Sequence, residues 1–450
     1  MLIFLTCLLL SGVNTTTNDP PPPDVVLIMI DDMGWADPGF MPGGSHDTPH
    51  MDALARRGTV FTDATSNGPN CAPSRASLMT GQWTPRHGVM TVGTPKRGKA
   101  EHRTLEPPRN GSALTPETIT LAQELQAAGY RTAHLGKWHL GTDPTAQGFE
   151  INIGGSRAGH PKSYFSPYKN DNLPDGEPGE SLTDRLGSEA LEIIAADDPR
   201  PLFLHLSFFA VHAPLQATPE EIAALQAANP GWDKRKATFA AMMQRTDRNI
   251  GRVLEAVGDD AIVVLCSDNG GLSGIGNNGP WRGTKGMLYE GGIRVALVVA
   301  TPGGSARTTD VPVTLMDLHP TILELAGVDV ESNKSDGDSL VPILSGTRDD
   351  LGARDLHWHF PAYLEGNRRL GTWRTTPVGV IRRGQWKLHE YFEDGRLELY
   401  DLSKDPAETT NLAATEPAIR DELHESMMKW RQEIDAPMPV PVTATVPDSP

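Results

Sequence analysis

The short stretch Asn70–Gly81 puts a cysteine where reactive chemistry is feasible. Cys71 lies among Asn, Pro, Ser and Arg, and Ala-Ser-Leu-Met follows, a pattern that predicts a loop-to-helix junction at the cysteine. At such a junction the helix N-terminus and the Arg75 guanidinium would favour negative charge near the sulfur. A small buried thiol on a turn fits the same neighbours equally well. These residues alone therefore leave both a reactive and a structural cysteine open.

Two pairs of oxygen-bearing side chains follow apolar segments. Residues 24–30 and 261–267 are continuous apolar runs rich in β-branched residues, which is typical of strands buried on both faces. Asp31 and Asp32 end the first run, and Asp268 and Asn269 end the second. Adjacent buried carboxylates are costly without a compensating cation, and oxygen-rich clusters suit hard divalent ions. The pairs are consistent with a divalent-cation site, although most such doublets are capping or turn residues.

Basic side chains follow the other predicted strands. Lys137 and His139 lie two residues apart near the end of the strand predicted from residue 131, so they would share one face and reach one anion. His212 follows the apolar run 201–209, at the carboxyl end where open α/β sheets bind ligands. His205 lies inside that run and is predicted to be a core histidine. A solvated lysine and a core histidine remain the alternative for the first pair.

The motif Cys71-x-Pro73-Ser74-Arg75, followed by Leu78-x-Thr80-Gly81, resembles the signature of the type I sulfatases. In that family the cysteine is converted after translation to formylglycine, whose hydrate attacks sulfur. Other family blocks are matched in chain order by Gly136–Gly141, His212-x-Pro214, Arg282–Gly286 and Glu290–Val295. The sequence has Gln82 where the family often carries a basic residue. This departure bears only on secondary recognition by the converting enzyme.

The resemblance implies a role for each of these polar residues. The implied Ca2+ ligands are Asp31, Asp32, the residue derived from Cys71, Asp268 and Asn269. The implied catalytic residues are Cys71, Arg75, Lys137, His139, His212 and Lys285. Cations would hold the formylglycine hydroxyls and a sulfate oxygen, and Asp268 could take the attacking hydroxyl's proton. His212 would protonate the leaving oxygen and His139 would take a proton from the second hydroxyl, but the two histidines could be exchanged.

Alternating helix and strand patterns indicate an α/β protein, and the resemblance implies an alkaline-phosphatase-like large mixed sheet sandwiched by helices. We expect a catalytic domain over 24–350 and a smaller C-terminal α+β domain over 351–435, with a short antiparallel sheet predicted from three strand-like runs. The Pro- and Val-rich tail 436–450 is predicted to be loose. Arg294, Asp317 and His319 are assigned to structural roles.

Two regions are candidates for reading the organic part of the substrate. The irregular segment 151–184 contributes Arg157 and His160, and the early C-terminal region contributes His357, His359 and Arg374. These regions resemble exo-acting carbohydrate sulfatases, with sulfated galactose or N-acetylgalactosamine as the substrate. Two alternatives remain open: a phosphonate or phosphodiester hydrolase that uses the same modified cysteine, and an inactive binding homologue.

Composition narrows the partners and the compartment. A net charge of −17 over 450 residues argues against nucleic acid, so a sulfate site must be a local basic pocket. Residues 1–17 resemble a signal peptide, followed by a Pro-rich linker over 18–23, and the apolar run is too short for a stable membrane span. Export to the periplasm or the medium is expected, as is a formylglycine-generating or anaerobic sulfatase-maturating enzyme during biogenesis. Lipidation of Cys7 is disfavoured because Thr6 precedes it.

Overall fold

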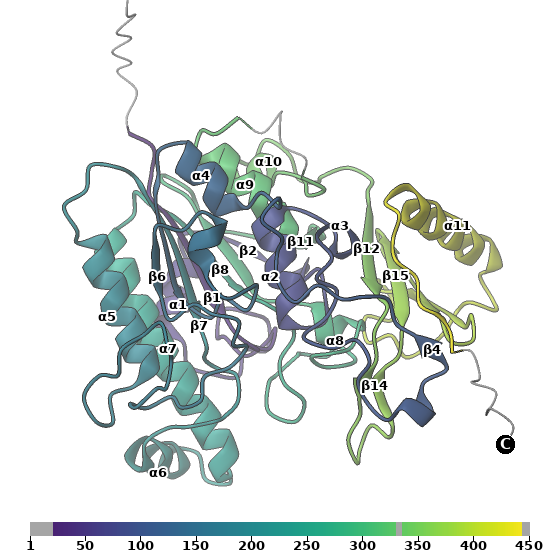
Figure 1. Ribbon diagram of the computed structural model, residues 1–450, viewed down its shortest axis with the longest axis horizontal. Coiled ribbons are helices and arrows are strands. Elements are labelled where there is room, and N and C mark those ends of the chain that lie inside the picture. The colour runs from purple at the N-terminus through teal and green to yellow at the C-terminus, as the bar shows by residue number, and fades with distance from the viewer. Residues whose placement is uncertain (1–20, 330–334, 443–450) are drawn as a thin grey trace, which may run out of the picture.

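A computed structural model describes residues 21–329 and 335–442 of the chain (Figure 1). The predicted signal peptide, the first half of the linker and residues 443–450 lie outside the described residues. The larger unit is built on an eight-stranded mixed sheet. Its strands, in spatial order, are β10 (Arg307–Thr309), β2 (Thr59–Phe61), β9 (Leu297–Ala300), β8 (Ile262–Ser267), β1 (Val25–Ile30), β7 (Leu202–Phe208), β5 (Arg131–Gly136) and β6 (Ile151–Ile153).

The sheet is buried on both faces, as its apolar strands predict. β1 pairs in parallel with β7 and with β8, and all six of its residues are fully buried. Alternate residues point to opposite faces of a strand, so Val26, Ile28 and Ile30 enter one core while Val25 and Leu27 enter the other. The apolar strand ends at Ile30, and the polar residues Asp31 and Asp32 follow at the edge of the core.

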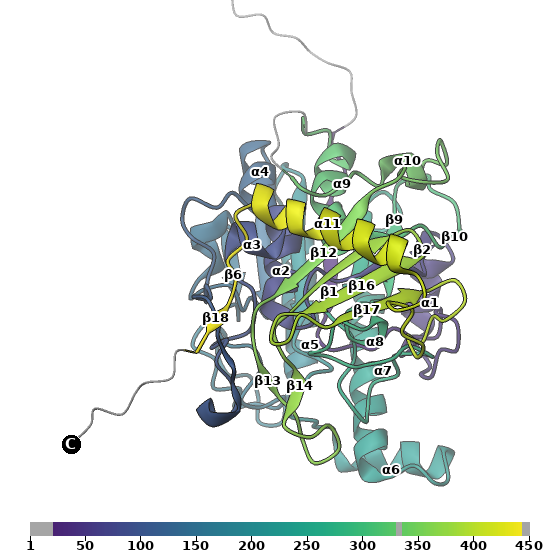
Figure 2. The same cartoon turned by 90° about the vertical axis from the view of Figure 1, so that its right-hand side faces the viewer.

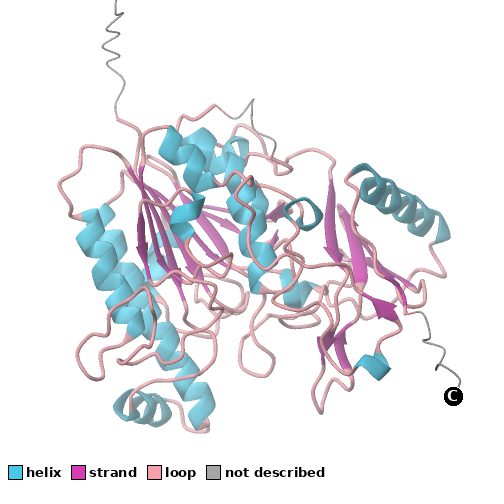
Figure 3. Cartoon of the chain, viewed as in Figure 1, coloured by secondary structure: helices cyan, strands magenta, loops and turns pink. Residues whose placement is uncertain are grey.

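Helices cover each face (Figure 1). One core contains residues of α1 (Pro49–Ala55), α5 (Leu182–Ile194) and α7 (Lys234–Val257). The opposite core contains residues of α2 (Cys71–Thr80), α4 (Leu121–Ala127) and α9 (Leu318–Leu325). Long loops join these elements (Figure 3), and short helices lie among them. The short elements are α3 (Thr84–His87), α6 (Pro219–Ala228), α8 (Glu290–Ile293), α10 (Val341–Leu344) and the strand pair β3 (Ala64–Thr65) and β11 (Val313–Thr314).

A separate antiparallel sheet forms the smaller unit, and helix α11 (Pro417–Glu433) lies across it (Figure 2). The strands, in order, are β12 (Asp355–Phe360), β15 (Val378–Arg383), β16 (Trp386–Tyr391) and β17 (Leu397–Asp401). A hairpin of β13 (Leu364–Glu365) and β14 (Trp373–Thr375) projects from it. The sheet packs its Ile381 face on α11 and its Trp358 face on Ile293 of the larger unit.

The predicted fold class is confirmed: a large mixed sheet between helices, with a separate antiparallel sheet near the C-terminus. Part of the segment predicted as a loose tail is ordered, because β18 (Val440–Pro441) pairs antiparallel with β4 (Leu105–Glu106). Across residues 21–329 and 335–442, no helix has both the length and the apolarity of a membrane span.

Buried ion pairs join the two units. Lys387 of β16 places its ammonium 2.8 Å from Glu290 of α8 and 3.0 Å from Glu408, and none of the three side chains is exposed. Arg294 pairs with Glu290 at 2.7 Å. Lys387, followed by Arg294, lowers the pKa of Glu290 despite its burial. Burying each of these charges is costly, and only the attraction of its buried partners offsets that cost. Removing one partner therefore destabilises the others.

The variant Lys387→Met tests this interface. It leaves two buried carboxylates short of a cation, so we expect the free energy of unfolding to fall by about 3–5 kcal/mol. The matched control is Lys404→Met, which removes a lysine paired with Asp401 but 82% exposed, and which should change stability by less than about 1 kcal/mol. Urea denaturation measures both values. Equal effects in the two variants would contradict the assignment.

Candidate active site

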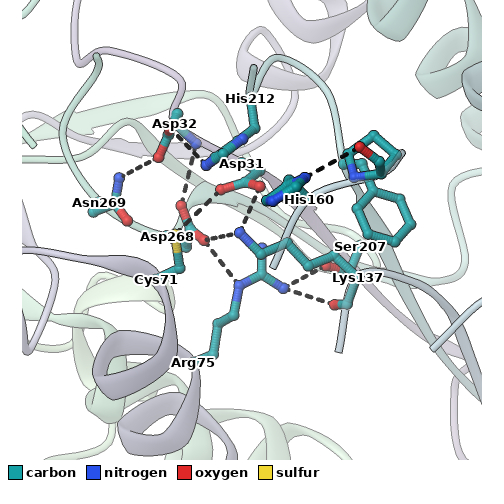
Figure 4. Close-up of polar contacts among 12 residues, drawn as sticks. Asp31, Asp32, Cys71, Arg75, Lys137, His160, Ser207, His212, Asp268 and Asn269 are labelled. Atoms are coloured by element: carbon teal, nitrogen blue, oxygen red, sulfur yellow. Dashed lines mark hydrogen bonds and ion pairs between the residues drawn. The ribbon is translucent and has the colours of Figure 1, made fainter. Parts of the chain in front are cut away.

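A cavity of about 630 Å3 opens where the carboxyl ends of β1, β5, β7 and β8 meet the first turn of α2. The larger unit provides most of its lining, and the β13–β14 hairpin region of the smaller unit provides the remaining wall. The lining residues are Asn70, Cys71, Val92, Arg97, His139, Gly159, His160, His212, Lys285, Gly286, Leu364, Glu365, Gly366 and Arg374. Most of the predicted catalytic and metal-binding side chains lie together in Figure 4, namely Asp31, Asp32, Cys71, Arg75, Lys137, His212, Asp268 and Asn269. The other two, His139 and Lys285, line the cavity.

Three carboxylates lie together beneath the cavity. Asp31 and Asp32 follow β1, Asp268 follows β8, and each is at most 1% exposed. The Asp32 backbone N–H donates to Asp268 Oδ1 at 3.2 Å, and the Asn269 side-chain amide donates to Asp32 Oδ1 at 2.8 Å. Neighbouring parallel strands bring these residues to one point, because their carboxyl ends meet at the same edge of the sheet.

Each carboxylate has its own cation, supplied by a different element. Lys137 Nζ lies 2.5 Å from Asp31 and Lys285 Nζ lies 2.6 Å from Asp32. Burial opposes ionisation, but Lys285 leaves the pKa of Asp32 below its ordinary value, whereas burial outweighs Lys137 and raises the pKa of Asp31.

The third pair anchors α2 to the sheet. Arg75 Nε lies 2.8 Å from Asp268, which it keeps ionised by lowering the carboxyl pKa against the effect of burial. Its guanidinium also donates to the Lys137 carbonyl at 2.8 Å and to Ser207 Oγ at 2.7 Å. Ser207 was not among the predicted site residues, although a serine at the end of a buried apolar run is the signal that marks it.

The donor set suits a hard divalent cation. Ligand atoms of Asp31, Asp32, Cys71 and His212 all lie within 4.8 Å of one another. Asp32 Oδ2 and Asn269 Oδ1 are buried and accept no hydrogen bond, which is costly unless a cation takes their lone pairs. Carboxylate and amide oxygens are the ligands that calcium prefers. His212 was predicted only as a catalytic residue, and its proximity to the oxygens is a finding of the structure.

Cys71 begins α2, as the loop-to-helix pattern predicts, and its side chain is buried. Its thiol donates to Asp31 Oδ1 at 3.5 Å and accepts from Lys285 Nζ at 3.1 Å. Burial raises the pKa of the Cys71 thiol to about 12 in spite of Lys137 and Lys285. An unmodified thiol here is therefore protonated at neutral pH and is a poor nucleophile.

The two predicted catalytic histidines both line the cavity. His212 Nε2 is 3.6 Å from Asp32 Oδ2, and its Nδ1 donates to the Ala213 carbonyl at 2.6 Å. Burial, followed by Lys137, holds the pKa of His139 well below its usual range, so its ring is neutral at neutral pH. The two-residue strand spacing proposed for Lys137 and His139 is wrong, because β5 ends at Gly136 and both follow in its exit loop.

The predicted substrate contacts divide into two groups. His160 and Arg374 line the cavity, and the His160 ring stacks against His212 with centroids 5.9 Å apart. Arg157 is exposed and is not among the lining residues.

His357 and His359 do not reach the cavity, which corrects their assignment as substrate contacts. His357 lies in β12 and stacks on Trp430 of α11 with ring centroids 4.2 Å apart. His359 Nε2 donates to the Pro437 carbonyl at 2.9 Å. Both are at most 5% exposed. These residues belong to a strand, and the two histidine side chains pack within the smaller unit.

Two further residues were missed by the sequence analysis. Arg97 lines the cavity from a loop that its Gly and Pro neighbours make irregular. Tyr164 donates from its hydroxyl to the carbonyls of Phe209, at 2.5 Å, and His212, at 2.9 Å, so it fixes the segment that carries His212. A buried tyrosine needs such a partner, but sequence does not say which.

Comparison with known proteins agrees with this geometry. The sequence profile described as "Sulfatase" matches residues 23–328, and the profile "N-sulphoglucosamine sulphohydrolase, C-terminal" matches residues 281–433. The chain belongs to the sulfatase family. The sulfatase is 31% identical to a "Sulfatase" of Formosa agariphila, over 91% of this chain and 88% of that protein. It is also 30% identical to human N-acetylgalactosamine-6-sulfatase, over 71% of this chain and 65% of the human protein.

Solved structures place the sulfatase in the same fold. The structure of Ps i-CgsB in complex with k-i-k-neocarrahexaose superposes with a TM-score of 0.75 at 29% identity, covering 91% of this chain and 92% of that chain. A phosphonate monoester hydrolase of Agrobacterium radiobacter superposes with a TM-score of 0.68 at 23% identity, over 94% of this chain and all of that one, and shares the fold. The sulfatase is thus a type I member of the alkaline phosphatase superfamily and a sulfuric ester hydrolase.

The relocated His357 gives a pH-dependent prediction. Burial lowers the pKa of His357 to about 3 in the folded chain, whereas the ordinary value for histidine is about 6.5. Between these two pH values the unfolded chain binds a proton at His357 and the folded chain does not. Stability contributed by the neutral ring is therefore complete above about pH 6.5 and is lost as the pH falls toward 3. In His357→Phe, which keeps the stack on Trp430, we expect the stability-versus-pH slope to flatten by up to about 1.4 kcal/mol per pH unit.

Urea denaturation at several pH values between 4 and 7 measures this slope. The control is His102→Phe, whose side chain is exposed and which should follow the wild-type curve. Parallel curves for wild type and His357→Phe would refute the buried neutral state.

Proposed function

We propose that this sulfatase hydrolyses a sulfate ester on a carbohydrate, with Cys71 converted to formylglycine and with a calcium ion bound by Asp31, Asp32, Asp268 and Asn269. The observation that carries the proposal is the position of residue 71: its side chain faces the cavity within reach of Asp31 and of Lys285. Burial raises the pKa of the encoded thiol, so the unmodified side chain is a weak nucleophile. We infer that residue 71 is converted before it acts as the nucleophile.

Formylglycine would supply a hydrated aldehyde as the oxygen nucleophile, and calcium would supply a Lewis acid. The remaining chemistry falls to this chain's own residues. Lys285 and Lys137 present positive charge where the sulfate oxygens and the hydroxyls of residue 71 would lie. Arg75 cannot move, because it binds Asp268, Lys137 and Ser207 at once, so it fixes the start of α2 and with it residue 71.

The two histidines divide the proton transfers. His139 lines the same cavity as residue 71, and we assign it as the base that removes a proton from residue 71. His212 keeps a proton on Nδ1 through the Ala213 carbonyl, and its Nε2 faces Asp32 and the cavity. A proton on Nε2 would be stabilised by Asp32 and available to the leaving oxygen, so we assign His212 as the acid.

The substrate class rests on the relatives. The name of the human relative refers to a sulfated sugar, and the Ps i-CgsB structure is named as a complex with a neocarrahexaose. A cavity of about 630 Å3 has room for a sugar ring as well as the sulfate. We therefore propose that the substrate is a sulfated galactose or N-acetylgalactosamine unit at a chain end.

We also propose that the enzyme is exported. Its partner in biogenesis would be a formylglycine-generating or anaerobic sulfatase-maturating enzyme, which converts Cys71.

The variant Cys71→Ala tests the nucleophile. In protein coproduced with a maturation enzyme, we expect it to lower kcat for sulfate release by roughly 10⁴-fold or more, because no other side chain replaces the attacking oxygen. The matched control is Cys266→Ala, which removes the other described cysteine from the core and should retain turnover. Release of inorganic sulfate and the thermal midpoint are measured for both.

Three results would oppose the proposal. Substantial turnover by Cys71→Ala would exclude residue 71 as the nucleophile. An unmodified thiol in the intact mass of active protein would exclude conversion. A clear preference for aryl phosphonate over aryl sulfate would reassign the enzyme to the phosphonate hydrolases that share its fold.

Calcium binding is tested separately from turnover. Calcium at about 100 times its dissociation constant should stabilise chelator-treated protein by about 2.7 kcal/mol, seen as a rise in thermal midpoint. Asp32→Asn should abolish this rise, whereas Asp259→Asn, a carboxylate 90% exposed, should retain it. A rise of the same size in both variants would show that the ion binds elsewhere.

A further inference from the structure

Two arginines line the cavity outside the catalytic cluster. Arg97 comes from the loop before β4, and Arg374 comes from β14 of the smaller unit. Neither forms an ion pair with a carboxylate within the described ranges. Their hydrogen bonds go to neutral carbonyls: Arg97 Nη2 donates to Val92 at 3.2 Å and Arg374 Nη1 donates to Lys285 at 3.3 Å. Arg374 Nε is buried and donates to nothing.

The charge of this pair is not needed by the cluster below it. The three carboxylates there are matched by Lys137, Lys285 and Arg75 before any divalent ion is added. Burial, followed by Arg97, lowers the pKa of Arg374, and Asp32 and Glu365 only partly offset this effect. Glu365 shares the wall but is exposed and forms no ion pair with either. The cavity of a strongly acidic protein thus has a local excess of positive charge.

Packing holds both arginines in place. The Tyr363 N–H donates to the Pro95 carbonyl at 2.9 Å, which joins the Arg97 loop to the hairpin. Gly98 has a φ of +74° and lies against the Trp373 ring, where a Cβ would come within 2.4 Å of a ring atom. The stem of Arg374 crosses Gly286, where a Cβ would lie 2.6 Å from Arg374 Cδ. Arg374 therefore lies beside Lys285, and a ligand would find the pair already ordered.

We propose that Arg97 and Arg374 form a subsite for a second anionic group of the substrate, either a sulfate ester or a carboxylate, next to the sulfate that is cleaved. This inference rests on the proposed function, because it assigns the substrate of the same cavity. Guanidinium groups bind both kinds of anion through paired N–H donors, and a second anion would relieve the repulsion between them. The substrate class is then a saccharide with at least two anionic groups close together.

The test compares three sugars that differ in their second anion. N-acetylgalactosamine 6-sulfate has none, N-acetylgalactosamine 4,6-disulfate adds a sulfate, and the unsaturated chondroitin 6-sulfate disaccharide adds a carboxylate. Calorimetry on the Cys71→Ala protein gives dissociation constants without turnover. We expect a second anion to tighten binding by about tenfold to hundredfold, and the stronger of the two doubly anionic sugars identifies the kind of anion.

Arg97→Gln and Arg374→Gln should each remove most of this preference. Arg374→Lys, which keeps the charge but loses the paired donors, should restore part of it. The control is Arg369→Gln, which removes an exposed arginine from the same hairpin region but outside the cavity lining. It should leave the ratio of dissociation constants unchanged.

Two outcomes would overturn the subsite. One is equal binding of all three sugars by the Cys71→Ala protein that keeps both arginines. The other is a preference for a second anion that remains after each of the two glutamine substitutions. Sulfate release by the wild-type enzyme is scored separately. No release alongside the expected pattern of dissociation constants would overturn the proposed function while supporting a subsite for doubly anionic sugars.

Discussion

The structure depends on one constraint, the burial of three carboxylates at a single edge of the large sheet. Asp31, Asp32 and Asp268 have almost no contact with water, so each must be compensated by a positive charge. Lys137, Arg75 and Lys285 come from three elements that are distant in sequence. Satisfying these charges therefore fixes α2, the exit loop of β5 and the loop after β8 relative to one another.

The cavity above this cluster needs the smaller unit to complete it. Its floor belongs to the large sheet, but the wall around Leu364 and Arg374 belongs to the β13–β14 hairpin region. The buried pair of Lys387 with Glu290 joins the smaller unit, which carries this wall, to the larger unit. Glu290 also pairs with Arg294, so a residue assigned to a structural role is part of the joint between the units.

Sequence predicted the parts of the site that are local. The apolar runs before Asp31 and Asp268 are strands, and the cysteine motif starts a helix, because strand burial and helix onset are encoded within a few residues. The predictions that failed concerned contacts between segments that are distant in the sequence. Arg97 reaches the cavity only because Gly98 and Pro95 pack on the hairpin, and His357 leaves it only because β12 turns that ring toward Trp430. Neither packing has a signature in the neighbouring sequence.

The hairpin of β13 and β14 has one more consequence. Its residues contribute no carboxylate to the buried cluster, and they are separated from Cys71 by almost three hundred positions in the chain. Under the proposed function, bond cleavage and recognition of the surrounding sugar are therefore encoded in separate segments. Evolution could then lengthen, shorten or recharge this hairpin while the hydrolytic centre stays intact, and so redirect the proposed reaction from one sulfated substrate to another.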